Sequence, residues 1–292
     1  MDSRVVREQD MGDIEIGGHT FKRQNRTYIM GILNLTPDSF FVGSRASADD
    51  APARIQALFD EGADVVDLGA CSTRPGSVQP SEEEEWARLR PVLEAAAGRG
   101  WALSLDTWRS GIVMRAFDTV GAFVVNDISA GALDGKMLAT AGRLDLPYLA
   151  MHMRGTPETM QQYTQYPDIT EAVIAYFRDF AHRAACAGIR DWMADPGFGF
   201  AKTPEQNYTL LRELHRVVAA VERPVLVGLS RKSMVYNVLG ITPQEAMPAT
   251  QVVQFAALER GATWLRVHDV AQAVHTARIY STMYTSSPGA AK

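Results

Sequence analysis

The sequence predicts an α/β protein, a (β/α)8 TIM barrel with an N-terminal β-hairpin. Short apolar segments alternate eight times with longer amphipathic segments, and the apolar segments are unbroken, as in parallel strands covered on both faces. No low-complexity linker interrupts this alternation along the 292 residues, and such barrels reach about 250 residues as one domain. We therefore assign residues 1–27 to an N-terminal segment with the hairpin, 28–285 to the barrel and 286–292 to a flexible tail.

The hairpin and the strands follow from the apolar pattern. Ile14, Ile16 and Phe21 flank the turn signal Gly17-Gly18, an arrangement typical of a hairpin. Eight barrel strands are then predicted at Tyr28–Leu33, Val65–Leu68, Trp101–Leu105, Ala122–Val125, Tyr148–Met151, Asp191–Ala194, Val225–Gly228 and Thr263–Val267.

Helices are predicted between these strands. Ser81 followed by Glu84 is a capping-box signature, and Pro204 and Pro243 each follow a threonine at an expected helix start. The predicted helices include Ala48–Asp60, Ile169–Ala187, Thr203–Ala220, Gln244–Arg260 and Asp269–Met283. The alternative fold is a doubly wound open sheet, which is expected to carry a Gly-rich phosphate loop after its first strand. No such loop follows the first predicted strand here.

Composition excludes several classes of partner. The formal net charge is -5 and no long basic run occurs, so a nucleic acid is not an expected partner. No apolar segment approaches the roughly 20 residues that span a bilayer, and Met1 to Asp13 does not have the pattern of a secretory signal. The chain has two cysteines, Cys71 and Cys186, which fits a reducing compartment. We expect a cytoplasmic protein.

Polar residues follow nearly every predicted strand. Asn34, Asp106, Asn126, Asp195 and Lys232 each stand at or shortly after the end of an apolar segment. In a TIM barrel the active site lies at the carboxyl ends of the strands, so these side chains are expected on one rim. For any single residue the alternative is a helix cap or a turn former. The whole series is harder to explain in that way.

Seven of these strand ends resemble the motifs of dihydropteroate synthases. The matching segments, in chain order, are Asn34-Leu35-Thr36-Pro37-Asp38-Ser39-Phe40, Ser72-Thr73-Arg74-Pro75-Gly76, Asn126-Asp127-Ile128-Ser129, Met151-His152-Met153, Asp195-Pro196-Gly197-Phe198-Gly199-Phe200, Ser230-Arg231-Lys232-Ser233 and Arg266-Val267-His268-Asp269. The resemblance implies a pterin-binding barrel. It also implies a reaction in which 4-aminobenzoate displaces pyrophosphate from 6-hydroxymethyl-7,8-dihydropterin pyrophosphate, with Mg²⁺. A homodimer that meets through the C-terminal helices is implied as well.

The resemblance also implies a role for each matched residue. Asp106, Asn126, Met151, Asp195 and Lys232 would bind the pterin. The pyrophosphate would meet Asn34, Thr73, Arg266 and His268, with Asn34 also a metal ligand. The aminobenzoate would lie among Phe40, Thr73, Pro75, Phe200 and Ser233. Asp106, Lys232, Arg266 and His268 would be the catalytic residues.

The chemistry of these residue types supports the same roles. A pterin presents a row of N–H donors, which a carboxylate such as Asp195 accepts in pairs. Departure of pyrophosphate leaves a cationic methylene, which Asp106 would stabilise electrostatically. Arg266, His268 and Mg²⁺ suit a leaving group that carries several negative charges. The aromatic amine is neutral near pH 7, so it needs orientation more than a general base.

Some of these residues also have purely structural interpretations. Lys232 and Arg231 would otherwise be a solvated pair at a helix start, His268 a cap of the last helix and Phe200 an ordinary packing residue. We expect the remaining histidines of the barrel to be structural, because no metal-ligand spacing joins them to the cysteines or to one another. They are His152, His182, His215 and His275.

The chain departs from the family pattern in two loops. The first loop continues Phe41-Val42-Gly43 where the family has Asp-Gly-Gly, and Cys71 stands where an acidic or amide residue precedes the second motif. Cys71 is interpreted either as a small apolar filler at the base of the loop or as a thiol made reactive by nearby Arg74. Two other functions stay open, a non-catalytic pterin-binding homologue and a methyltetrahydrofolate-dependent methyltransferase.

Overall fold

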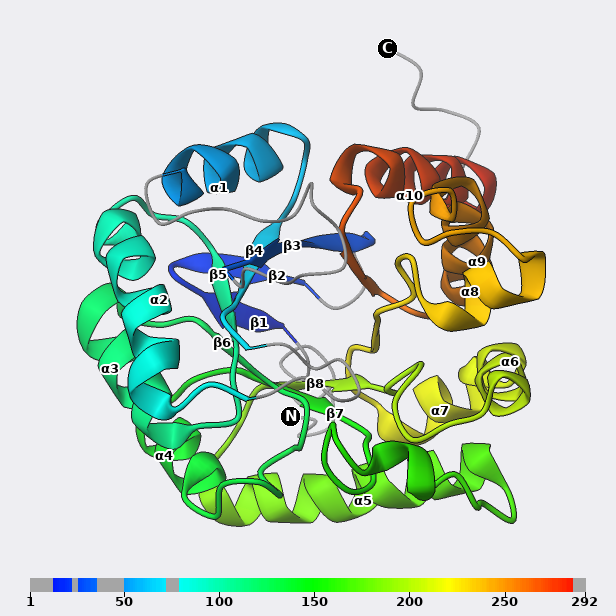
Figure 1. Ribbon diagram of the computed structural model, residues 1–292, viewed down its shortest axis with the longest axis horizontal. Helices are drawn as coiled ribbons and strands as arrows, with labels where there is room; N and C mark the ends of the chain where they lie inside the picture. The colour runs from blue at the N-terminus through cyan, green and yellow to red at the C-terminus, as the bar shows by residue number, and fades with distance from the viewer. Residues whose placement is uncertain (1–12, 23–25, 36–49, 72–78, 286–292) are drawn as a thin grey trace, which may run out of the picture.

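Eight parallel strands form a closed barrel with helices around it (Figure 1). The structure is a computed structural model that describes residues 13–22, 26–35, 50–71 and 79–285. The strands are β3 (Tyr28–Asn34), β4 (Val65–Gly69), β5 (Leu103–Asp106), β6 (Val124–Asp127), β7 (Tyr148–Met151), β8 (Trp192–Asp195), β9 (Leu226–Val227) and β10 (Trp264–Val267). They are hydrogen-bonded in the order β8-β7-β6-β5-β4-β3-β10-β9. A parallel bridge between Ala194 and Val225 closes the ring between β8 and β9. The predicted barrel is confirmed.

The helices form the outer layer. They are α1 (Ala51–Asp60), α2 (Glu82–Ala96), α3 (Ser110–Val120), α4 (Met137–Arg143), α5 (Ile169–Ala187), α6 (Pro204–Arg212), α7 (Leu214–Val221), α8 (Ser233–Leu239), α9 (Met247–Glu259) and α10 (Val270–Thr285). The predicted capping box is present, because the Ser81 side chain accepts from the Glu84 amide and the Glu84 side chain accepts from the Ser81 amide. Within the described residues, no helix is long and apolar enough to cross a membrane.

Two helix predictions need correction. The predicted helix Thr203–Ala220 is two helices, α6 and α7, which are separated at Glu213 (φ -102°, ψ 11°). The apolar periodicity continues through the break, because Leu210 and Leu214 are both buried and lie four residues apart. The pattern therefore gave no sign of it. Helices α3, α4 and α8 were not among the predicted ones.

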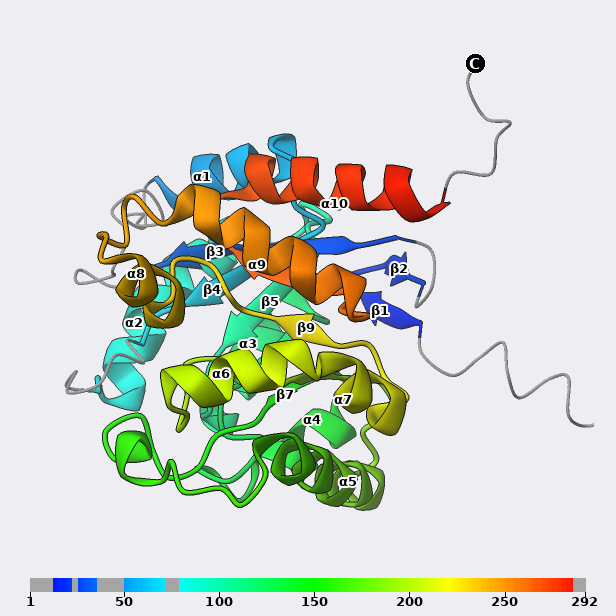
Figure 2. The same ribbon diagram turned by 90° about the vertical axis from the view of Figure 1, so that its right-hand side faces the viewer.

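The N-terminal hairpin closes one end of the barrel. Strands β1 (Ile14–Ile16) and β2 (His19–Phe21) pair antiparallel, as predicted. Their buried side chains Ile14, Ile16 and Phe21 pack on the first inward-facing residue of the barrel strands, among them Tyr28 and Trp264. The Phe21 ring lies 5.4 Å from that of Tyr28 and 5.3 Å from that of Trp264, between centroids. Figure 2 shows the hairpin at the end where the strands begin. The opposite end is left for the polar rim.

Candidate active site

The predicted polar residues form a row across neighbouring strands. Asn34, Gly69, Asp106 and Asn126 are successive partners in the register of β3, β4, β5 and β6. Gly69 leaves a gap in this row, because a Cβ there would lie 3.5 Å from Asn34 Oδ1 and 3.8 Å from Asp106 Oδ2. On the other side of the barrel, Met151 of β7 and Asp195 of β8 are partners. All these residues face the interior at the carboxyl ends of the strands.

Arg266 joins two carboxylates in the centre of this rim. Its Nε donates to Asp67 Oδ2 at 2.7 Å, and its Nη2 donates to Asp106 Oδ2 at 2.8 Å. Asn126 Nδ2 donates to the same Asp67 oxygen at 3.0 Å. The other oxygen of Asp67, Oδ1, is buried and has no hydrogen-bond partner among the described residues. The cluster is thus a preorganised set of donors and acceptors with one acceptor unused.

Burial shifts the ionisation of this cluster. It raises the pKa of Asp106 to about 7, an effect opposed by the positive charge of Arg266 and increased by the carboxylate of Asp67. The ion pair with Arg266 thus favours the charged form of Asp106, and burial opposes it. A cation that forms close to it would favour the charged form further, which is the electrostatic role expected of Asp106.

Asp195, at the end of β8, and Lys232, directly before α8, face the same space. A Cβ on Gly228, which follows β9, would lie 3.7 Å from Lys232 Nζ and 3.9 Å from Asp195 Oδ2. Lys232 also donates to the Phe198 carbonyl and lies 4.8 Å from the centroid of the Phe200 ring. Burial lowers the pKa of Lys232 to about 8, with Asp195 opposing the shift. The side chain stays mainly protonated at pH 7.

His268 is a neutral group in this structure. Its Nδ1 lies 3.0 Å from Ser230 Oγ, and its backbone amide donates to the same hydroxyl. Burial lowers the pKa of His268 to about 3, and the charge of Arg266 acts in the same direction. At neutral pH His268 is therefore an uncharged hydrogen-bonding group and not a cation.

The solvated-pair interpretation of Arg231 and Lys232 is wrong. Arg231 forms a bidentate ion pair with Asp269, at 2.8 Å and 2.7 Å, and only 8% of its side chain is exposed. The pair joins the loop after β9 to the loop after β10. Arg231 therefore fixes the position of the residues on either side of it, Ser230 and Lys232.

Comparison with known proteins agrees with this geometry. The family described as pterin binding enzyme matches residues 30–268. The dihydropteroate synthase of Neisseria meningitidis serogroup C is 42% identical over 83% of this chain and 87% of its own length. A dihydropteroate synthase structure from Yersinia pestis superposes with a TM-score of 0.86 at 36% identity, covering 94% of this chain and 99% of that one.

The chain belongs to the dihydropteroate synthase family. A folate synthesis bifunctional protein of Arabidopsis thaliana is also similar, at 37% identity over 93% of this chain. The chain spans 60% of the length of that plant protein. The matches with the Neisseria and Yersinia dihydropteroate synthases, by contrast, extend over most of both chains.

Several residues predicted from the synthase motifs lie outside the described part of the chain. They are Phe40, Thr73 and Pro75, together with the atypical segment after Phe40. Of the other aminobenzoate residues, Phe200 borders an apolar cluster that contains Met151, Ile128 and Met153. Ser233 is the exposed first residue of α8. Of the residues predicted for aminobenzoate, Phe200 therefore lies in an apolar wall beside Lys232, whereas Ser233 lies at the surface.

The synthase motifs did not include Asp67, although it lies at the centre of the rim. It is a carboxylate inside the apolar segment Val65–Leu68 and is fully buried. That position was the available signal, because a charged residue is almost never buried in a strand unless it is paired. The apolar pattern predicts only a strand there, and the charge within it marks the site.

The environment of Cys71 argues against a reactive thiolate. Burial raises the pKa of this thiol, and the nearby Glu85 carboxylate raises it further. Arg109, whose Nη1 lies 3.7 Å from Cys71 Sγ, is ion-paired with Glu85 and donates to the Pro80 carbonyl at 2.5 Å. The structural interpretation of Cys71, as an anchor at the base of the second loop, is the one that fits the described residues.

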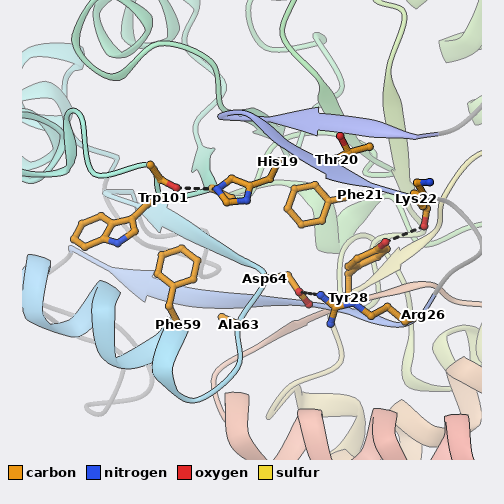
Figure 3. Close-up of a pocket in the computed structure, with 12 residues that line it drawn as sticks. His19, Thr20, Phe21, Lys22, Arg26, Tyr28, Phe59, Ala63, Asp64 and Trp101 are labelled. Carbon is orange, nitrogen blue, oxygen red and sulfur yellow. Dashed lines mark hydrogen bonds and ion pairs between the residues drawn. The ribbon is translucent and has the colours of Figure 1, made fainter. Parts of the chain in front are cut away.

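A separate cleft lies at the other end of the barrel (Figure 3). Its volume is about 540 Å³, and its lining comes from the hairpin, the end of α1 and the start of β5. In Figure 3, the rings of Phe21, Phe59 and Trp101 surround it, with Asp64 paired to Arg26 at one side. None of the residues predicted for the synthase site lines it. We assign this cleft no part in the reaction.

Proposed function

We propose that the protein is a dihydropteroate synthase of folate biosynthesis. It joins 6-hydroxymethyl-7,8-dihydropterin pyrophosphate to 4-aminobenzoate and releases 7,8-dihydropteroate and pyrophosphate. The observation that carries this proposal is the single rim that holds Asp106, Asn126, Asp195 and Arg266. Crystal structures of the similar dihydropteroate synthase from Thermus thermophilus are complexes with 4-aminobenzoate and with 6HMPPP, which supports the same two substrates here.

The pterin binds between the two walls of the rim. The Asp195 carboxylate accepts paired N–H groups from the pyrimidinone edge, while Lys232 donates to an acceptor beside it. Asn126 supplies a donor and an acceptor on the facing wall, and Met151 packs against the ring. This seat puts the reacting methylene near Asp106, whose charge stabilises the cation as the leaving group departs.

The leaving pyrophosphate meets the residues on the β10 side of the rim. Arg266 presents a guanidinium, and His268 presents a neutral N–H donor. Thr73 is predicted to complete this site from the second loop, and Phe40, Thr73, Pro75, Phe200 and Ser233 are predicted to orient the aminobenzoate. Once the carbon–oxygen bond to pyrophosphate has broken, the amine attacks the cationic methylene, and the amine proton leaves to solvent or to the released anion.

The oxygen donors of the rim fit a magnesium ion. Asn34 Oδ1 and Asp106 Oδ2 face the same gap over Gly69, and Mg²⁺ prefers a few protein oxygens together with water and substrate phosphates. Among the described side chains, no group of three His, Cys, Asp or Glu is arranged to hold a metal. We propose Asn34 as a protein ligand. A bound ion would offset charge on the departing pyrophosphate.

Release of pyrophosphate tests this function. The purified protein should release pyrophosphate only when both substrates and Mg²⁺ are present. A non-catalytic homologue would bind the pterin without release, and a methyltransferase would instead bind methyltetrahydrofolate. No release from a folded, pterin-binding protein would therefore overturn the proposal.

The leaving-group site has its own variant. His268→Ala should raise the KM for the pyrophosphate substrate several-fold or more while the affinity for plain 6-hydroxymethylpterin stays unchanged. Arg266→Ala is a poorer test, because it would leave Asp67 and Asp106 without their shared cation. Equal losses for both ligands in His268→Ala would contradict the assignment.

We also propose that the protein is a cytoplasmic homodimer. The exposed apolar side chains Val252 of α9 and Ile279 and Met283 of α10 lie on two helices that pack together, and they are 69%, 59% and 60% exposed. A second copy that covers them would bury this surface. Both cysteines are free thiols, which supports the cytoplasmic location.

A further inference from the structure

Lys202 is a buried lysine that none of the site assignments uses. It ends the segment Asp195–Lys202, which connects β8 to α6, and only 4% of the residue is exposed. Its Nζ donates to the carbonyls of Gly197 at 2.9 Å and Phe200 at 3.1 Å. It is also hydrogen-bonded to Nδ1 of His152, which follows β7, at 2.9 Å. One amine therefore joins two turns of the same loop to the neighbouring strand end.

These contacts lead directly to the proposed pterin seat. Gly197 contacts both side chains, because its N–H donates to Asp195 Oδ1 at 2.8 Å and its carbonyl, in the next peptide group, accepts from Lys202. The Phe200 carbonyl also accepts from Lys202, and the Phe200 ring lies 4.8 Å from Lys232 Nζ. Lys202 thus contacts Gly197, which binds the Asp195 carboxylate, and the backbone of Phe200, whose ring lies beside Lys232.

The loop needs such support because its backbone is unusual. Gly197 and Gly199 have φ of 71° and 83°, and Ala201 adopts φ 47° without being glycine. A non-glycine residue in this region costs of order 1 kcal/mol and persists only where surrounding contacts fix it. The loop also packs against β7 too closely for a side chain at Gly197, since a Cβ there would lie 2.1 Å from the His152 carbonyl oxygen.

A buried amine destabilises the folded chain unless its hydrogens find acceptors, so its retention here indicates a specific role. Removing an ammonium from water costs several kcal/mol unless its hydrogens find acceptors. Burial lowers the pKa of Lys202, and the nearby Asp195 carboxylate opposes that shift. An apolar residue would fill the same space without this cost, but it would leave the Gly197 and Phe200 carbonyls without this donor. The benefit of lysine here is the geometry it imposes.

We propose that Lys202 is a positioning residue of the pterin seat, which fixes the Asp195 carboxylate through Gly197 and the Phe200 ring through its carbonyl. This inference rests on the proposed function, because it takes the Asp195 carboxylate as the acceptor for the pterin. Lys202 itself touches neither substrate.

The test compares Lys202→Met with Lys136→Met in the full chain. Methionine keeps most of the length of lysine but has no donor, and Lys136 is an exposed lysine next to α4. Calorimetry with 6-hydroxymethylpterin, well below the unfolding transition, should show at least a tenfold loss of affinity in Lys202→Met and no change in the control. The KM for the pterin substrate should rise more than kcat falls, and amide exchange in residues 197–201 should quicken.

A double-mutant cycle separates positioning from general weakening. If Lys202 acts through Asp195, the loss of affinity in Lys202→Met combined with Asp195→Asn should be smaller than the product of the two single losses. A folded Lys202→Met with affinity within twofold of the wild type would overturn the inference. If that variant does not fold, Lys202→Leu, which also lacks a donor, is used and judged by the same criterion. Failure of the wild type to bind pterin would instead refute the proposed function.

Discussion

At the scale of single residues, the centre of the rim is a set of mutually satisfied buried charges. Arg266 is held by Asp67 and Asp106, and Lys232 lies near Asp195. Breaking a buried pair by removing one partner is strongly destabilising, since the other charge is left uncompensated. Variants that probe this site therefore have to keep size and hydrogen bonding where they can.

The first prediction concerns pH and Lys232. Because burial lowers its pKa to about 8, the ammonium that donates to the pterin is lost as pH rises through that value. The part of the affinity for 6-hydroxymethylpterin that depends on Lys232 should change little from pH 6.5 to about 7.5 and then fall up to about tenfold per unit above pH 8. Folding responds in the opposite direction. The unfolded chain holds the proton up to its ordinary pKa of 10.5, so stability gains as pH rises from about 8 towards that value.

Calorimetry at several pH values checks this prediction, with Lys232→Met as the control. Titration of the ligand itself contributes to both proteins, so only the difference between them reports on Lys232. The variant should bind more weakly at pH 7 and should lack the additional fall above pH 8. Identical pH profiles would show that Lys232 is not the titrating donor.

The second prediction concerns the two thiols. Cys186 is exposed, whereas burial and Glu85 raise the pKa of Cys71. Since the thiolate is the reacting form, iodoacetamide at pH 7.5 should modify Cys186 at least tenfold faster than Cys71. Mass spectrometry of the labelled peptides over time measures both rates. Faster labelling of Cys71, with protection by the pterin substrate, would instead support the reactive-thiol hypothesis.

At the scale of secondary-structure elements, the sequence predicted where strands and helices occur better than where they end. Strands β3, β5 and β8 each run one residue past the predicted end, to Asn34, Asp106 and Asp195. In each case the last residue is polar and faces the interior, so the apolar pattern stops before the strand does. The polar last residues that hide the true strand ends from the apolar pattern are therefore the candidate site residues.

The candidate site was predictable to a similar degree. The rim residues stood at strand ends and could be found from the barrel geometry. Asp67 was missed because it lies within an apolar segment, and Lys202 because its function depends on backbone carbonyls that a sequence does not reveal. The break between α6 and α7 was hidden for a related reason, since the buried face continues through it.

The third prediction tests how closely two helices approach. A Cβ on Gly142 of α4 would lie 1.8 Å from the carbonyl oxygen of Ala187, at the end of α5. Helix propensity alone would make Gly142→Ala stabilising by about 1 kcal/mol, but overpacking against backbone costs about 1–3 kcal/mol or more. The clash should win, so the variant should be less stable by about 1–2 kcal/mol in urea unfolding.

Gly135→Ala is the matched control for this helix contact. Gly135 lies just before α4, and a Cβ added there would have no neighbouring atom within 4 Å. Its substitution should change the free energy of unfolding by no more than about 1 kcal/mol, in the stabilising direction. If Gly142→Ala were as stable as this control, α4 and α5 would have to be free to separate.

At the scale of the whole molecule, the fourth prediction concerns self-association. The proposed dimer has twice the 32.0 kDa mass of the chain. Val252→Asp combined with Ile279→Asp should leave the fold intact, because both side chains are exposed, and should give a monomer by sedimentation equilibrium. Met114→Asp on α3, where the side chain is 40% exposed, should remain dimeric. A double variant of unchanged mass would exclude this surface as the interface.

The N-terminal hairpin covers one end of the barrel, so in the described part of the chain only the end with the polar rim is open to ligands. Ile14, Ile16 and Phe21 pack at the end where the strands begin against buried side chains of the barrel, among them Met30 and Met193, so the barrel interior is filled below the rim. Under the proposed function, both substrates and both products therefore cross the rim at the carboxyl ends of the strands. A pterin bound in the proposed seat would be covered by the aminobenzoate that enters after it. Entry through one opening thus implies an order of binding, with the pterin first and the amine second. Product inhibition should follow the same order.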